Sequence, residues 1–214
     1  MDIVNEAIER YLERLAPEED EVLKEMEQLA ELEHFPIVGP LVGRLLCQLA
    51  RMMKAKEVLE LGSGFGYSAY WFAKGIEPDG WIVCTDFSEA NVRLAREFFA
   101  KGKVSRRIQF EVGDSLDIIS RFPGLFDIVF MDIDKEQYPT ALPKILPRLR
   151  TGGLLITDNL LWFGAVLQDQ PSDASTMGIK AYTRLLYSSP ELYTTIIPIR
   201  DGVGLSLKLS SSRA

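Results

Sequence analysis

The chain has 214 residues, of which 47% are hydrophobic, and a formal net charge of −7 with a single histidine. This length suits one domain rather than two, and the negative charge disfavours broad binding to the phosphates of nucleic acids. No apolar run reaches the roughly 18 residues of a membrane span, and the charged segment 1–14 lacks the apolar core of a signal peptide, so we expect a cytoplasmic protein with no membrane partner.

Residues 1–53 are predicted to form N-terminal helices. Apolar side chains recur at helical spacing from Ile3 to Leu12 and again from Leu23 to Leu29. Pro36 and Pro40 are expected to interrupt the chain before a further helix over 41–53.

Residues 54–214 differ in pattern from the N-terminal segment, because short β-rich runs alternate with helical stretches. Strands are predicted at 57–61, 81–85, 108–112, 126–131 and 154–157, and helices at 68–74, 89–101 and 138–149. This alternation predicts βαβ units in a parallel sheet covered by helices on both faces. Two last runs, 193–199 and 202–209, meet at Arg200-Asp201-Gly202, and so short a connection requires antiparallel pairing.

A glycine-rich turn, Gly62, Gly64 and Gly66, lies between the first strand and the next helix. Glycines there let the backbone turn sharply and approach a ligand closely. A dinucleotide-binding turn would have a glycine where Tyr67 stands. Glu60 would repel a pyrophosphate, but it suits a ligand with a positive end, such as the amino group of methionine.

Two further acids follow the next strands. Asp86 ends the second strand, 22 residues after Gly64, where a carboxylate can bind ribose hydroxyls. Asp114, before Ser115, follows the third strand and can contact the adenine edge. Each is also an ordinary turn residue by type; together with Glu60 and the glycines, they favour an adenosine-containing ligand.

A carboxylate and amide cluster is predicted at the ends of the fourth and fifth strands. Asp132 follows the fourth strand, and Asp158 and Asn159 follow the fifth. Neighbouring parallel strands would bring these oxygen donors to one point, where they suit a hard divalent cation such as Mg²⁺. Lys135 can serve there as a general base. The alternative is an Asx turn, a solvated strand end and a surface lysine.

Four segments carry a resemblance to a known family: residues 60–68, 131–138, 152–162 and 199–202. They resemble the cation-dependent O-methyltransferases, which include catechol and caffeoyl-coenzyme A O-methyltransferases and small bacterial relatives. The resemblance runs from about Phe35 to the end. It implies a single α/β domain over 1–214 with a Rossmann-like methyltransferase fold, a seven-stranded mostly parallel sheet with an antiparallel C-terminal hairpin.

The resemblance also implies roles for individual residues. It implies metal ligation by Asp132, Asp158 and Asn159, a base at Lys135, and a homodimer. Implied cofactor contacts are Val38, Glu60, Gly62, Ser68, Asp86 and Ser115, to which the residue pattern adds Gly64, Asp114 and Asp132.

The expected reaction is transfer of a methyl group from S-adenosylmethionine to a hydroxyl with a vicinal oxygen, on a catechol-like small molecule. The segment 163–177 should cover the substrate, yet it shows no pattern that identifies one. Methylation of 5-hydroxyuridine in tRNA stays open as a second possibility, since that base edge also presents two adjacent oxygens. The glycine turn alone would also suit a NAD-dependent oxidoreductase, but Tyr67 and the Asp158-Asn159 pair speak against it. It would also suit a non-catalytic S-adenosylmethionine-binding protein, but such a protein would be expected to lack the metal ligands, and all three are present.

Overall fold

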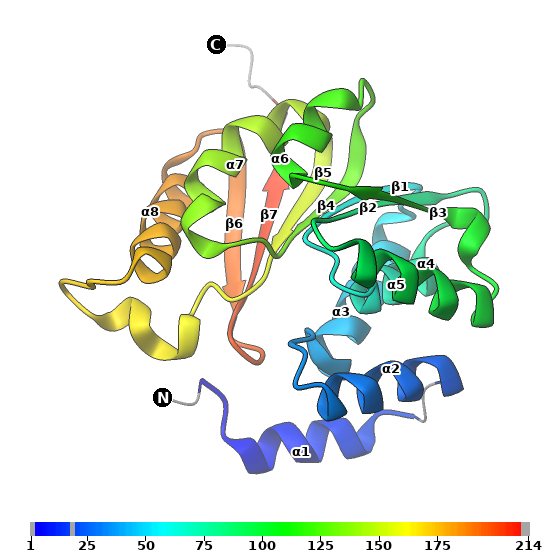
Figure 1. Cartoon of the computed structure of the whole chain (residues 1–214). Helices are drawn as coiled ribbons and strands as arrows, with labels where there is room; N and C mark the ends of the chain where they lie inside the picture. Colours follow the sequence, from blue (N-terminus) through cyan, green and yellow to red (C-terminus); the bar gives the residue numbers. More distant parts are fainter. Residues whose placement is uncertain (1–2, 18–19, 211–214) are drawn as a thin grey trace.

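The computed structural model describes residues 3–17 and 20–210 (Figure 1). Its seven-stranded sheet has the order β3-β2-β1-β4-β5-β7-β6. The strands are β1 (Glu57–Leu61), β2 (Trp81–Asp86), β3 (Ile108–Val112), β4 (Phe126–Met131), β5 (Leu149–Thr157), β6 (Leu192–Ile197) and β7 (Val203–Lys208). The first five are parallel, and β7 runs antiparallel to both β5 and β6. The predicted α/β fold class is therefore confirmed.

Helices cover both faces of the sheet, as Figure 1 shows. The longer helices are α1 (Glu6–Leu15), α2 (Glu21–Leu32), α3 (Gly39–Met53), α4 (Tyr67–Gly75), α5 (Glu89–Lys101), α7 (Tyr138–Ile145) and α8 (Ala174–Ser188), with a short α6 (Ser115–Ile118). Side chains from α2 to α5 join one core cluster, and those from α6 to α8 join a second. The strands that end at the site are thus held between two apolar layers.

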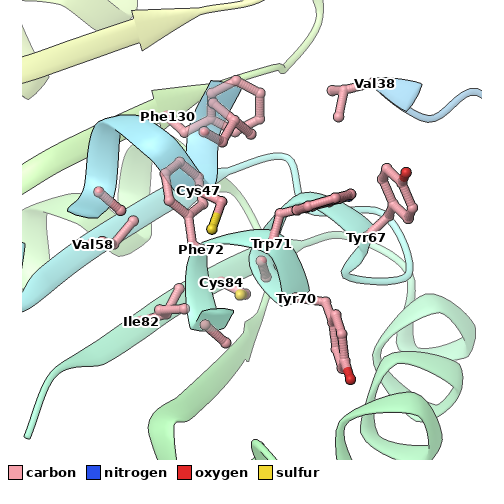
Figure 2. Close-up of a cluster of buried hydrophobic side chains, with 14 of the residues drawn as sticks. Val38, Cys47, Val58, Tyr67, Tyr70, Trp71, Phe72, Ile82, Cys84 and Phe130 are labelled. Atoms are coloured by element: carbon pink, nitrogen blue, oxygen red, sulfur yellow. The ribbon is translucent and has the colours of Figure 1, made fainter. Parts of the chain in front are cut away.

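Helix α4 is buried nearly all round, and Figure 2 shows Phe72 beside Phe130 of β4, with Tyr67 and Tyr70 on the other side of the helix. The Phe72 ring lies 5.9 Å from that of Phe130. A Cβ on Gly43 of α3 would lie 2.2 Å from Trp71 Nε1, so α3 and α4 pack very closely. This packing fixes the helix that follows the glycine turn.

Prolines account for two corrections to the predicted boundaries. Pro40 lies inside α3, at its first turn, where the missing N–H needs no partner. The predicted helix 138–149 ends at Ile145, followed by a 3₁₀ turn that contains Pro147. Strand β5 then begins at Leu149, five residues before the predicted strand. Pro40 thus lies within the first turn of its helix, and Pro147 lies beyond the end of the helix that was predicted to contain it.

Helix α8 was not predicted. Its buried side chains include Ile179, Tyr182 and Leu186, which recur at helical spacing, and the Asp173 carboxylate accepts the Thr176 N–H at its start. It packs on the second core cluster, together with α7.

The N-terminal helices differ in how they are packed. Helix α2 buries Leu23, Met26 and Ala30, whereas α1 has no buried residue. Within residues 3–17 and 20–210, none of the helices combines the length and the apolar character needed to cross a bilayer.

Candidate active site

A cavity of about 1370 Å³ lies at the carboxyl ends of the parallel strands. The predicted cofactor residues that line it are Val38, Gly62, Gly64, Ser68, Asp86 and Ser115. The predicted metal and base residues that line it are Asp132, Lys135, Asp158 and Asn159. The sheet thus brings both predicted groups to one cavity, as expected for ligand sites in open α/β sheets.

The glycine turn links β1 to α4 under strict steric limits. Gly62 has φ 81°, and a Cβ there would lie 2.2 Å from the Asp132 carbonyl oxygen. Gly66, at the start of α4, has φ 86°, and a Cβ there would meet the Phe99 ring at 2.4 Å. Any larger residue would push the turn out of place, so these positions require glycine.

Glu60 lies beneath the turn and is fully buried. Its Oε1 accepts a hydrogen bond from Ser68 Oγ, while its Oε2 has no partner among the described residues. Burial raises the pKa of Glu60 to about 7, although bonds from Ser63 and Ser68 oppose this rise. Glu60 is not among the residues that line the cavity.

Ser68 therefore stands between Glu60 and the cavity. Its hydroxyl hydrogen is committed to Glu60, so its oxygen lone pairs remain to accept a bond from a ligand. An ammonium group, such as that of a methionine moiety, fits this environment.

The Asp86 carboxylate accepts three hydrogen bonds from neighbouring residues and can still accept one more. Its Oδ2 accepts the Gly64 N–H at 2.9 Å, and its Oδ1 accepts Ser88 N at 2.8 Å and Asn91 Nδ2 at 3.1 Å. A carboxylate offers about four acceptor positions, so one remains for a hydroxyl such as that of a ribose.

Asp114 and Ser115 have different positions. Asp114 Oδ1 caps α6 by accepting the N–H groups of Leu116 (2.7 Å) and Asp117 (3.0 Å), and Asp114 does not line the cavity. Ser115 lines the cavity and shares a 2.7 Å hydrogen bond with Thr85 Oγ1. An adenine contact of Asp114 stays a prediction.

The predicted metal residues meet because β4 and β5 are parallel neighbours with Met131 paired to Thr157. Asp158 is 5% exposed. Burial, followed by the charge of Asp132, raises the pKa of Asp158 to about 7. The charges of Asp132 and Asp158 therefore repel each other, and a cation bound by both carboxylates would relieve the repulsion.

The donor set fits a hard cation. Two carboxylates and the Asn159 amide supply oxygen ligands, with space in the cavity for water and substrate oxygens. Among the residues that the structure describes, no group of three or more His, Cys, Asp or Glu side chains is arranged to hold a metal. A site here would accordingly depend on the amide as its third ligand.

Lys135 is held in a defined position and is 11% exposed. Its Nζ donates to Asp132 Oδ1 at 2.5 Å and to the Ile133 carbonyl at 3.2 Å. The ammonium also lies 5.2 Å from the centre of the Tyr138 ring and 5.9 Å from that of Trp162. The predicted base thus reaches the predicted metal residues.

Arg200, Asp201 and Trp162 line the cavity and were not predicted to have a role, whereas Phe163 begins the segment predicted to cover the substrate. Arg200 Nη1 donates to the Ile37 carbonyl at 2.6 Å and so joins the β6–β7 turn to the segment before α3. Asp201, in the same turn, is buried, and Trp162 and Phe163 line the cavity beside it. The Asp-Gly pair at the hairpin was a visible signal, but it indicates a turn and not a function.

Known proteins that are similar to this chain are O-methyltransferases. A family model described as O-methyltransferase matches residues 13–209. The catechol O-methyltransferase of Niastella koreensis is 27% identical over 94% of this chain and 96% of its own length. The caffeoyl-CoA O-methyltransferase of Petroselinum crispum is 28% identical over 91% of this chain and 86% of its own.

A solved structure extends the agreement to the fold and the cofactor. TomG of Streptomyces achromogenes, an O-methyltransferase solved in complex with S-adenosylmethionine, is 29% identical with a TM-score of 0.88, covering 95% of this chain and 96% of its own. These matches favour an O-methyltransferase over the NAD-dependent oxidoreductase and the non-catalytic binding protein that the glycine turn alone left open. The chain therefore belongs to the O-methyltransferase family, and it is an S-adenosylmethionine-dependent O-methyltransferase of the catechol and caffeoyl-CoA type.

Proposed function

We propose that this enzyme methylates a hydroxyl with a vicinal oxygen on a catechol-like small molecule, with a divalent cation, Mg²⁺ by preference, at Asp132, Asp158 and Asn159. The convergence of these three oxygen donors at the ends of β4 and β5 carries the proposal. When bound, the cation would hold two adjacent acceptor oxygens and lower the pKa of the hydroxyl that reacts.

The proposed cofactor contacts are residues that line the cavity, together with Glu60 and Asp114, which do not line it. Gly62, Gly64 and Ser68, with Glu60 behind Ser68, would bind the methionine end. The remaining proposed contacts are Val38, Asp86, Asp114, Ser115 and Asp132.

Lys135 is the proposed general base. In its neutral form, Nζ takes the proton of the acceptor hydroxyl. The bond between that oxygen and the methyl carbon forms as the carbon–sulfur bond breaks, and the electron pair stays on sulfur. Because the cavity aligns the reacting groups, orientation supplies much of the rate, with effective molarities on the order of 10⁵ M or more.

Acidic side chains on the cavity wall favour acceptors without phosphate. Helix α1 contributes Glu6, Glu9 and Glu13, and α2 contributes Glu27 and Glu31. A tRNA or a coenzyme A thioester would bring phosphates toward these carboxylates, at an electrostatic cost.

Two basic residues that could contact tRNA phosphates, Arg107 and Lys56, have partners within the chain. Arg107 donates to the carbonyls of Ala73 and Ile76, and Lys56 pairs with Asp79. We therefore favour a small-molecule acceptor over tRNA.

Removal of the cation tests the proposal. EDTA should abolish methyl transfer to a catechol, and added Mg²⁺ should restore it. Asp158→Ala should lower kcat/KM by at least about a hundredfold, because a ligand is lost, while S-adenosylhomocysteine still binds. Asp127→Asn is the matched control, since it alters a carboxylate that accepts backbone N–H groups at the opposite edge of the sheet. Full activity of the wild-type enzyme in EDTA would disprove the cation role.

We also propose a homodimer. Helix α1 exposes Ile8, Tyr11, Leu12 and Leu15 at helical spacing, an apolar face that a second copy can cover. Sedimentation would show a mass of one chain if this part of the proposal is wrong. The cytoplasmic location stays a prediction.

A further inference from the structure

The turn between β6 and β7, residues 198–202, packs against the segment that follows β5, residues 158–164. Leu160 N donates to the Gly202 carbonyl, and Leu161 N donates to the Asp201 carbonyl, both at 2.9 Å. A Cβ on Gly202 would lie 2.4 Å from Leu161 Cγ. The two segments therefore touch with no space for another side chain, and the turn fixes the segment that begins at Asp158.

Asp201 adds a side-chain link to this contact. Asp201 is 6% exposed, and its Oδ1 accepts the Phe163 backbone N–H at 2.5 Å. Burial raises the pKa of this carboxyl, while the Phe163 N–H and the Asn159 side chain act on it as hydrogen-bond donors and oppose the rise. Oδ2 is buried without a partner among the described residues. A buried carboxylate that is only partly satisfied costs stability, so its presence here calls for a functional explanation.

The linked segment has an unusual backbone. Asn159, Trp162 and Phe163 have φ of 60°, 45° and 49°, in the left-handed region that non-glycine residues seldom adopt. Each such residue costs on the order of 1 kcal/mol, and the conformation persists only where its surroundings impose it. The bonds from Leu160, Leu161 and Phe163 to the β6–β7 turn provide that constraint.

The direction of the Asn159 amide follows from its partner. A carboxylate only accepts hydrogen bonds, so the atom of Asn159 that faces Asp201 is the amide nitrogen. The amide oxygen then points away from Asp201, and Asn159 lines the cavity beside Asp158. Only that oxygen can ligate a hard cation.

We propose that Asp201 is a positioning residue that acts through Asn159. By holding the amide nitrogen and the Phe163 N–H, it presents the amide oxygen to the cation and keeps the Trp162–Phe163 pair against the cavity. This inference rests on the proposed function, because it requires a cation at Asp158 and Asn159.

Mn²⁺ binding, measured by titration calorimetry with S-adenosylhomocysteine present, tests this role without relying on activity. Asp201→Ala should weaken Mn²⁺ binding by about 10-fold to 100-fold, the usual effect of losing an outer-shell partner. Asp201→Asn keeps an oxygen that can accept both bonds, so its Mn²⁺ affinity should stay within about threefold of wild type. S-adenosylhomocysteine affinity should change little in either variant.

Asp127→Asn is again the matched control. Asp127 accepts the N–H groups of Lys56 (2.7 Å) and Glu57 (2.9 Å) and pairs with Arg150, and it does not line the cavity, so its substitution should leave Mn²⁺ affinity unchanged. If circular dichroism shows that Asp201→Ala does not fold, Asp201→Ser replaces it, since a serine hydroxyl is too short to reach both donors.

The outcomes separate the two proposals. Wild-type protein that takes up no Mn²⁺ refutes the cation dependence, and this inference with it. Wild-type protein that binds Mn²⁺, together with a folded Asp201→Ala or Asp201→Ser variant that binds it equally well, refutes the positioning role alone.

Discussion

Glu60 illustrates how a single buried carboxyl couples the cofactor site to folding. In the unfolded chain its pKa is near 4.5, and in the folded protein burial raises it to about 7. The groups around it are Ser63, Ser68 and Cys84, with the charge of Asp132 nearby. The protonated form is therefore the one that the fold favours.

This shift has a definite sign for stability. The folded state binds the Glu60 proton more tightly than the unfolded state does. The stability that the protonated Glu60 contributes is therefore fully present below pH 4.5 and is lost as the pH rises through about 7. Glu60→Gln cannot ionise and should avoid this loss. At pH 8, the variant should gain up to about 3 kcal/mol in free energy of unfolding over wild type, and near pH 4 little or nothing.

Urea unfolding from pH 4 to 8, with EDTA present and no cofactor, measures this difference. A gap between Glu60→Gln and wild type that stays constant across the range would contradict the assignment. Because the glutamine oxygen can still accept the Ser68 hydroxyl, the variant keeps the bond that orients Ser68.

At the scale of elements, the β6–β7 hairpin completes one edge of the sheet and also contacts the segment that follows β5. Strand β7 pairs with β5, with Thr157 opposite Gly204, and so brings the turn past the end of β5. A Cβ on Gly204 would lie 2.4 Å from Leu160 Cδ1. The hairpin therefore supports the segment that carries Asn159 and the two aromatic residues beyond it.

Gly202→Ala tests this support. Gly202 has φ 87°, and an added methyl group would collide with Leu161, so the variant should lose roughly 1–3 kcal/mol in free energy of unfolding. The displaced segment should also raise the KM for the acceptor several-fold, while the affinity for S-adenosylhomocysteine stays the same.

Gly124→Ala is the matched control. A Cβ there would meet only Glu57 Oε2, at 3.8 Å, and no strained φ is involved. Unfolding curves and acceptor KM values measured side by side for the two variants decide the question. An unchanged acceptor KM in Gly202→Ala would show that the hairpin does not position the segment.

Topology explains which parts of this site can be predicted from sequence. Asp132 and Asp158 follow neighbouring parallel strands, so their meeting follows from the βαβ pattern alone. The role of Asp201 depends on β7, and not β6, lying beside β5, an order that a hairpin pattern leaves open. Helix α8 escaped prediction because Gly178 and several polar residues obscure its apolar spacing.

At the scale of the whole molecule, the net charge is −7, and many of the acidic side chains line the cavity. Glutamates of α1 and α2 line the cavity, together with Asp134 and Glu136. Among the described cavity residues, Lys135 and Arg200 are the only lysine or arginine side chains. Such a wall creates a negative potential that attracts cations and repels anions.

We expect the charge of the acceptor to affect its use. A catechol with an amine side chain should have a kcat/KM about tenfold above that of a catechol with a carboxylate at low ionic strength. The ratio should shrink at about 0.5 M salt, because salt screens charges separated by more than a few ångströms. The triple variant Glu6→Gln, Glu9→Gln, Glu13→Gln should narrow the ratio in the same way.

A second triple variant separates local from total charge. Glu97→Gln, Glu111→Gln and Glu191→Gln remove the same number of charges from positions that do not line the cavity. This variant should keep the wild-type ratio between the two acceptors, because screening confines the effect to charges near the substrate. Equal narrowing in both triple variants would mean that net charge, and not the cavity wall, sets the preference.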